Sequence, residues 1–142
     1  MINGVFITPL SIIYTPGGDV MHAMKQSDPG HIGFGEAYFS QVAYGAIKAW
    51  KRHREMTLNL VVPVGEVRFV LYDDQKGRHT FQELVISPSN YCRLTVPPMV
   101  WVGFQGLNPK GSILLNIANL EHDPLEVDKQ EISQIDYNWE TV

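Results

Sequence analysis

The chain has 142 residues, of which 44% are hydrophobic and 18% are charged, and its formal net charge is −4. This length fits one domain, and the apolar content is sufficient for an ordinary core, which argues against intrinsic disorder. No basic run is present, so we expect no binding to nucleic acid or to an anionic membrane surface.

The single cysteine and the shortness of the apolar runs indicate the cellular compartment of the protein. Cys92 is the only cysteine, so no intrachain disulfide can form, and a lone thiol fits a reducing environment. Residues 1–6 lack the basic and apolar regions of a signal peptide, and no apolar run approaches the roughly 20 residues of a membrane span. We therefore expect a cytoplasmic protein.

The N-terminal residues predict a hairpin or a pair of arms. Residues 7–14 are rich in β-branched and aromatic side chains and lead into the turn signal Pro16-Gly17-Gly18-Asp19. Residues 20–25 could form the return strand. We treat residues 1–33 as N-terminal strands that could be exchanged in a dimer.

Residues 34–120 are expected to form the core of a barrel, because short strands alternate there with Gly, Pro and Asn turns. In residues 67–72, apolar side chains alternate with Arg68 in the period-two pattern of a half-buried strand. The expected strands cover residues 34–42, 47–53, 58–65, 67–72, 80–86, 91–96, 99–107 and 112–120. The tail, residues 121–142, starts with a turn, and residues 135–139 could dock back onto the barrel.

The stretch from Gly45 to Gly65 carries the most informative spacing. Lys51 and His53 lie one pleat apart, so they share a strand face. The stretch resembles the first motif of the cupin family, where two histidines and a glutamate bind a metal inside a small barrel. His53 occupies the second histidine position, but Lys51 occupies the first, and the remaining ligand positions hold Leu58 and Val102. The side chains of Lys51, Leu58 and Val102 cannot ligate a divalent ion. We predict an all-β fold, a single-domain cupin or jelly-roll β-barrel over residues 1–142, with no metal and no cofactor.

Further segments extend the resemblance to one branch of the cupins. In order and spacing the chain is similar to dTDP-4-dehydrorhamnose 3,5-epimerase and its relatives, which act on nucleotide-linked sugars without metal. The matching segments include Phe34-Gly35-Glu36, Gly45 to Lys51, Ser87-Pro88-Ser89-Asn90, Pro97-Pro98 and Ile135 to Trp139. The resemblance implies a homodimer. It places the family's general-base histidine on Lys51 and its tyrosine acid on Asn116, whereas Lys48 keeps the charge of the family's arginine.

A second branch, the sugar-nucleotide 3,4-ketoisomerases, is also similar. Residues 48–53 overlay its Arg-Gly-x-His-x-His segment and keep the second histidine, a catalytic residue of that group, as His53. A tyrosine on the preceding strand assists in that group, and Tyr38 is the nearest candidate here. Histidine is suited to moving a proton at neutral pH.

The role of the first motif lysine stays open between two interpretations. A lysine that points into a small barrel is costly unless it meets water or an anion, which favours phosphate or carboxylate binding by Lys51. General-base catalysis by Lys51 would require burial to lower its pKa. Lys48 lies on the other parity of the strand, so contact with a ligand would require a local bulge.

These resemblances give a set of predicted site residues. Packing explains Trp50 and Trp101 better than stacking on a base does, but we retain Trp101 as a possible ligand contact. The predicted catalytic residues are His53, Lys51 and Tyr38, and the predicted substrate-binding residues are Phe34, Glu36, Lys48, Trp101 and Asn116.

The predicted function is metal-independent epimerisation or isomerisation of a nucleotide-linked 4-keto-6-deoxy sugar. Such a reaction would serve the biosynthesis of cell-surface polysaccharide or of deoxysugars. The alternative is a non-catalytic cupin that binds a sugar nucleotide. The expected partners are therefore a nucleotide-sugar substrate and a second copy of the chain.

Overall fold

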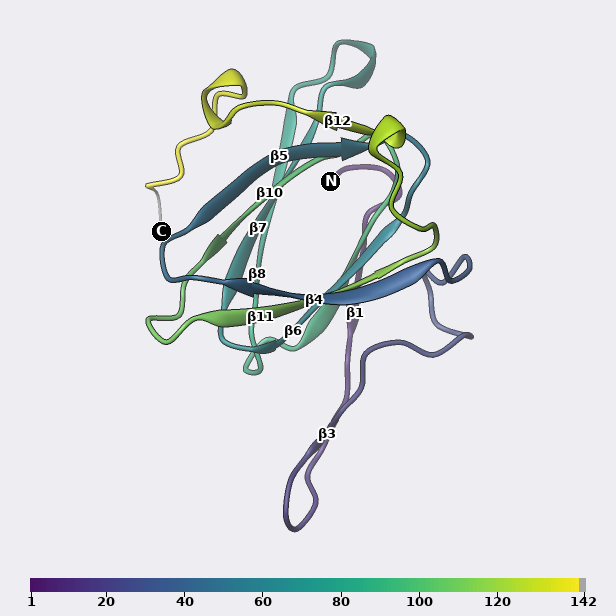
Figure 1. The fold of residues 1–142 in the computed structure, drawn as a ribbon, viewed down its shortest axis with the longest axis vertical. Helices are drawn as coiled ribbons and strands as arrows, with labels where there is room; N and C mark the ends of the chain where they lie inside the picture. Colours follow the sequence, from purple (N-terminus) through teal and green to yellow (C-terminus); the bar gives the residue numbers. More distant parts are fainter. Residues whose placement is uncertain (141–142) are drawn as a thin grey trace.

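Two five-stranded sheets face each other and enclose the core of the protein (Figure 1). The computed structural model describes residues 1–140. The strand order is β1-β9-β6-β11-β4 in the first sheet and β12-β5-β10-β7-β8 in the second, and all neighbouring strands are antiparallel. The described chain is therefore an antiparallel jelly-roll barrel, which confirms the predicted fold class.

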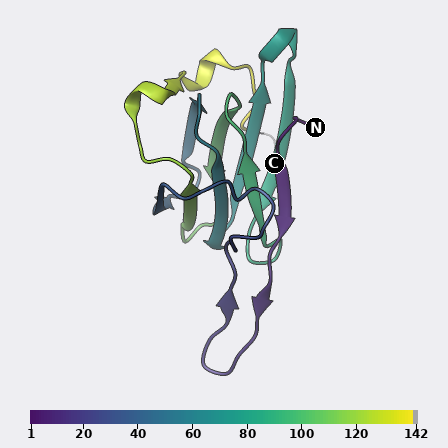
Figure 2. The same ribbon diagram turned by 90° about the vertical axis from the view of Figure 1, so that its right-hand side faces the viewer.

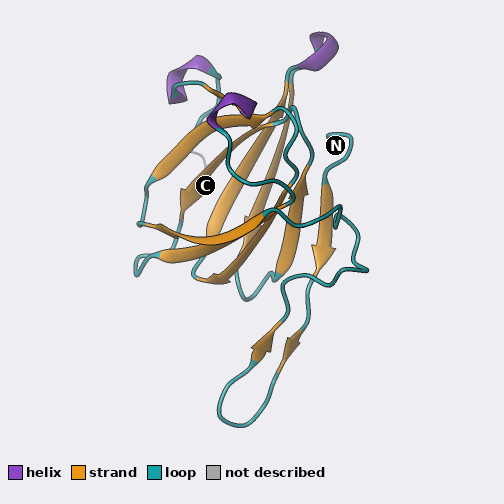
Figure 3. Ribbon diagram, turned by 45° about the vertical axis from the view of Figure 1, so that its right-hand side comes forward, coloured by secondary structure: helices purple, strands orange, loops and turns teal. Residues whose placement is uncertain are grey.

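The strands follow one another along the chain with short connections. The first sheet contains β1 (Phe6–Pro9), β9 (Cys92–Val96), β6 (Leu58–Val64), β11 (Ser112–Ala118) and β4 (Glu36–Val42). The second sheet contains β12 (Val127–Lys129), β5 (Ile47–His53), β10 (Trp101–Gly106), β7 (Val67–Asp73) and β8 (Thr80–Ile86). A separate hairpin consists of β2 (Ile12–Ile13) and β3 (Val20–Met21), and single 3-10 turns form η1 (Gln75–Gly77), η2 (Pro124–Glu126) and η3 (Ile132–Gln134). Figure 3 shows how little of the described chain is helical.

Because successive side chains point to opposite faces of a strand, every second side chain points into the space between the two sheets. In β11, for example, Leu114 and Asn116 are buried, while Leu115 between them faces outward and is only partly buried. The inward apolar side chains form one cluster that includes Leu60, Phe69 and Leu94. This cluster fills one part of the barrel and leaves space between β4 and β5.

The tail covers the outer face of the second sheet. Trp50 of β5 packs there against Trp139, with ring centroids 5.4 Å apart, and Trp101 and Ile135 belong to the same buried cluster. The indole Nε1–H of Trp50 also donates a hydrogen bond to the carbonyl oxygen of Ile132 at 3.4 Å. The expected docking of residues 135–139 is confirmed.

The N-terminal hairpin projects away from the barrel, as Figure 2 shows. Its base is tied to β9 by Arg93, whose side chain is fully buried. The guanidinium donates hydrogen bonds of 2.8 Å to the carbonyl oxygens of Ala23 and Pro29 and pairs with Asp28 at 3.2 Å. The segment after the hairpin is therefore held firmly, whereas the hairpin itself makes few contacts. No helix among residues 1–140 is long and apolar enough to cross a membrane.

Candidate active site

A cavity of about 610 Å³ opens between the edges of the two sheets. One wall consists of β4 and β11, and the opposite wall consists of β5 and β12. Apolar side chains close its inner end, and the polar side chains lie on the two walls. The polar lining includes Tyr38, Ser40 and Asn116 on one side and Lys48, Lys51, His53 and Lys129 on the other, together with His122, Gln130, Glu131 and Gln134.

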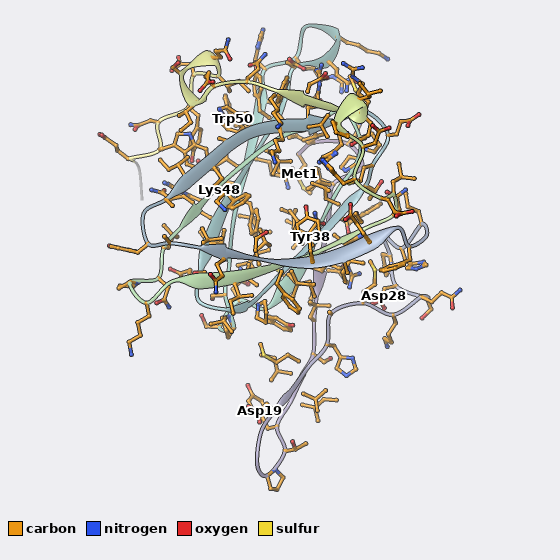
Figure 4. The ribbon with its side chains drawn as sticks, in the orientation of Figure 1. Met1, Asp19, Asp28, Tyr38, Lys48 and Trp50 are labelled. Atoms are coloured by element: carbon orange, nitrogen blue, oxygen red, sulfur yellow. The ribbon has the colours of Figure 1, made fainter. Side chains whose placement is uncertain are left out.

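A bulge in β5 turns two lysines toward this cavity. Val102 of β10 pairs with Lys51 and Phe104 pairs with Lys48, so β5 contains one extra residue between these two pairs. Val102 and Phe104 both pack toward the barrel core, so the lysines opposite them share the inward face. In Figure 4 Lys48 lies in the space between β4 and β5, whereas Trp50 lies on the other side of β5. We expected that Lys48 could contact a ligand only if β5 contained a bulge, and this bulge is present.

His53 is held by a buried carboxylate. Its Nδ1 is hydrogen-bonded to Oε1 of Glu126, which belongs to η2. The second oxygen, Oε2, accepts hydrogen bonds of 3.0 Å from the backbone N–H groups of Glu55 and Met56. Burial raises the pKa of Glu126, but these hydrogen bonds from His53 and the two amides outweigh it and lower the pKa below the usual 4.5. The carboxylate is therefore ionised and accepts a hydrogen bond from Nδ1–H of His53, so Nε2 is the ring nitrogen that Glu126 does not engage.

Three lysines lie on the same wall of the cavity. Lys129 of β12 is directly opposite Lys51 of β5, and Lys48 lies beyond the bulge. Within residues 1–140 none of the three forms an ion pair; the ammonium of Lys48 only reaches the carbonyl oxygen of Gln41, at 3.5 Å. Partial burial lowers the pKa of Lys51, and the charges of Lys129 and Lys48 lower it further. This wall therefore gathers three lysines that no carboxylate pairs with among residues 1–140.

The opposite wall presents a tyrosine and an asparagine from neighbouring strands. Tyr38 of β4 and Asn116 of β11 are directly paired, and Nδ2 of Asn116 donates a hydrogen bond of 2.9 Å to the hydroxyl oxygen of Tyr38. The hydroxyl proton of Tyr38 therefore remains available to another acceptor. Oδ1 of Asn116 is buried and has no donor among the described residues.

The fold agrees with that of a solved structure over almost the whole chain. A dTDP sugar isomerase from Desulfovibrio desulfuricans G20 is 32% identical, with a TM-score of 0.93 over 99% of this chain and 93% of that chain. The chain belongs to the dTDP-sugar isomerase and epimerase family of cupins.

Curated relatives agree with the family assignment. A probable low-salt glycan biosynthesis epimerase, Agl13 of Haloferax volcanii, is 30% identical over 100 residues; the match covers 68% of this chain and 64% of that protein, just under two thirds of its length. The spore coat polysaccharide biosynthesis protein SpsL of Bacillus subtilis is 26% identical over 115 residues, which cover 76% of each chain. No family model matches the sequence.

The structure brings five of the eight residues predicted from the family resemblance into one cavity, namely Tyr38, Lys48, Lys51, His53 and Asn116. Phe34 and Glu36, just before and at the start of β4, are not among the residues that line it, so their contact with a nucleotide stays a prediction. Trp101 requires a correction. It is 3% exposed in the outer cluster, and its Nε1–H donates to Asp74 at 3.2 Å, so it packs the tail instead of facing the cavity.

The residues predicted for the site did not include Glu126, Lys129 or His122. Lys129 belongs to β12, which pairs with β5, and Glu126 directly precedes β12. His122 is exposed but lines the cavity. The local signal was a turn at His122-Asp123-Pro124, which says nothing about a partner more than 70 residues away. Among residues 1–140, no three His, Cys, Asp or Glu side chains gather as a metal-binding group.

Proposed function

We propose that this protein is an isomerase or epimerase of a nucleotide-linked 4-keto-6-deoxy sugar. The observation that carries the proposal is the His53–Glu126 pair: Glu126 engages Nδ1 of a histidine that lines the cavity, and Tyr38 lines the other wall. The reaction needs no metal in this proposal, because Lys51, Leu58 and Val102 occupy the ligand positions of the metal-binding cupins.

The proposed chemistry starts with a proton transfer beside the ketone. Nε2 of His53 removes the proton from the carbon next to the carbonyl, and the electron pair moves into the carbonyl oxygen to give an enolate. Lys48 and Lys51 stabilise negative charge on this wall, and Tyr38 donates a proton from the opposite wall. Return of a proton to the same carbon on its other face gives an epimer. Protonation at the former carbonyl carbon, with loss of the neighbouring hydroxyl proton, moves the ketone by one position.

Asn116 has a binding role in this proposal. An unpaired buried acceptor costs on the order of 1–3 kcal/mol, and Oδ1 of Asn116 has no donor among the described residues. This oxygen is covered in the free protein, so it receives a hydrogen bond from a sugar hydroxyl in this proposal only after the side chain turns toward the cavity. The same side chain fixes the hydroxyl of Tyr38, so ligand binding and proton donation would be coupled.

The proposal is tested by incubating the protein with a dTDP-4-keto-6-deoxyhexose in D2O and following the ring protons by NMR. Exchange at C3 and C5 identifies an epimerase, and exchange at C3 with movement of the ketone identifies a 3,4-ketoisomerase. Binding without any exchange would overturn the proposal in favour of the non-catalytic sugar-nucleotide protein.

We also propose a cytoplasmic homodimer in which the N-terminal hairpin contacts the partner. Support for the dimer comes from apolar side chains that face solvent in the isolated chain: Ile13 and Val20 are 47% and 50% exposed on the hairpin, and Phe39 is 69% exposed on the first sheet. Support for the compartment comes from Cys92, which is buried as a free thiol.

A further inference from the structure

We propose that Lys48, Lys51 and Lys129 together bind the diphosphate of the substrate, and that Lys51 takes up a proton when the diphosphate binds. This inference rests on the proposed function, since it assigns the anion that the cavity receives. It adds Lys129 to the site. It also assigns Lys51 to anion binding and removes general-base catalysis as its role.

The register of the lysine strands, and the lack of a carboxylate partner for the lysines within residues 1–140, indicate that an anion binds beside them. Lys51 and Lys129 are direct cross-strand partners, and like charges in that position destabilise a sheet. The outward-facing neighbours on the same two strands show the usual arrangement, because Arg52 pairs with Asp128 at 2.9 Å. Inside the cavity the corresponding positions carry only positive charge, which a bound anion would compensate.

The carboxylates near the cavity do not fill this role. Glu126 is committed to His53 and to two backbone amides. Glu131 lines the cavity but pairs with none of the lysines within residues 1–140. Three ammonium groups exceed what the single charge of an enolate requires, whereas a diphosphate carries at least two negative charges and several acceptor oxygens.

The charges around Lys51 predict proton uptake. The groups that share its cavity are Lys48 and His53 on β5, Lys129 on β12, Glu131 after β12, Tyr38 on β4 and His122 after β11. In the free protein, burial and the two other lysines lower the pKa of Lys51 from 10.5. A diphosphate favours the charged form and so raises this pKa again. Between the free and bound values of the pKa, the complex therefore holds more protons than its separate components do.

This assignment divides the cavity between its lysines and its other polar side chains. Lys48, Lys51 and Lys129 hold the diphosphate by charge, and Lys51 in the complex is a cation that cannot act as the general base. The sugar ring then extends from the lysines toward His53 and the Tyr38–Asn116 pair. Proton abstraction is left to His53.

The test is calorimetric titration of dTDP into the protein, in buffers of different ionisation enthalpy, at several values between about pH 7 and pH 10. We expect net proton uptake by the wild type that grows in the alkaline range. Lys51→Arg should bind within about threefold of the wild type without this uptake, because it stays charged throughout. Lys51→Met and Lys129→Met should each bind at least about tenfold more weakly, and Lys110→Met, on an exposed turn, should match the wild type.

Several outcomes would overturn the inference: no binding of dTDP, unchanged uptake in Lys51→Arg, or unchanged affinity in Lys51→Met and Lys129→Met. The D2O exchange assay on the same preparations keeps the two proposals apart. Exchange with unchanged dTDP affinity in the lysine variants contradicts the diphosphate site alone. Lysine-dependent binding and uptake without exchange supports the site and contradicts the enzyme.

Discussion

At the scale of single residues, the pairing of His53 with Glu126 sets the chemistry of the cavity. A buried carboxylate that accepts three hydrogen bonds is fixed in position, and it fixes the imidazole in turn. This arrangement selects the tautomer with its free nitrogen at Nε2, the form needed to accept a proton. Glu126 is therefore a positioning residue that acts through His53.

Replacement of Glu126 by Gln tests this positioning role. The amide can still receive or donate a hydrogen bond, but it does not stabilise the imidazolium that forms when His53 accepts a proton. We expect the rate of C3 proton exchange to fall by at least about tenfold while dTDP affinity changes little. Glu126→Asp should recover part of the rate. A rate equal to that of the wild type would contradict the role.

The acid limb of the stability curve gives a second test at the same residue. Because the pKa of Glu126 is lowered below 4.5 in the folded protein, its stabilising contribution is present above that value and is lost as the pH falls through the folded pKa. Wild type should therefore exceed Glu126→Gln in free energy of unfolding at neutral pH, and the difference should shrink at about pH 3.5. Urea titrations at both pH values measure it, and an equal difference at both would contradict the pKa assignment.

The sequence indicated His53 but not its partner, for a physical reason. His53 stands at a recognisable spacing within one strand, which local sequence can encode. Glu126 reaches it only because the three residues that follow pair with β5 in a particular register. Lys129 depends on the same register. Such a pairing depends on the folded topology and leaves no local pattern.

At the scale of elements, β5 has two different faces at once. Its bulge presents Lys48 and Lys51 to the cavity, while Trp50 faces the docked tail on the outer side. The tail therefore supports the strand that carries the site. Strand positions were predictable, because turn residues and period-two alternation delimit them, and residues 47–53 and 80–86 match β5 and β8 in full. The bulge itself was not predictable and was stated only as a condition for ligand contact by Lys48. One extra residue in a strand leaves no signal in local propensity.

Removal of the aromatic ring at Trp139 should weaken this support. Trp139 is 6% exposed and contacts the ring of Trp50, so Trp139→Ala should lower the free energy of unfolding by about 3–5 kcal/mol. Chemical denaturation measures the loss. Leu125→Ala, at a residue that is 83% exposed in the same tail, is the control and should have little effect. A loss below about 1 kcal/mol for Trp139→Ala would show that the tail is not a structural support.

At the scale of the whole molecule, the barrel separates a reactive cavity from the surfaces available for assembly. The cavity opens between β4 and β5, and the second sheet is covered by the tail. Exposed apolar side chains remain on the projecting hairpin, at Ile13 and Val20, and on the first sheet, at Phe39. The proposed dimer would cover them with a second copy of the chain.

The hairpin provides the test of the dimer. Ile13 and Val20 are cross-strand partners, and the double variant Ile13→Glu with Val20→Glu places two charges on the exposed face. We expect light scattering after size exclusion to give a dimer for the wild type and for Val85→Glu, a control on β8, but a monomer for the double variant. A monomeric wild type would contradict the dimer, and a dimeric double variant would contradict the role of the hairpin.

The central claim is that His53 moves the proton next to the ketone. The most direct measurement is the rate of C3 proton exchange with a dTDP-4-keto-6-deoxyhexose in D2O for wild type, His53→Asn and the control His79→Asn, which alters an exposed turn. We predict measurable exchange in wild type and His79→Asn, and a loss of about a hundredfold or more in His53→Asn with dTDP binding retained. Exchange by His53→Asn at the wild-type rate would contradict the account.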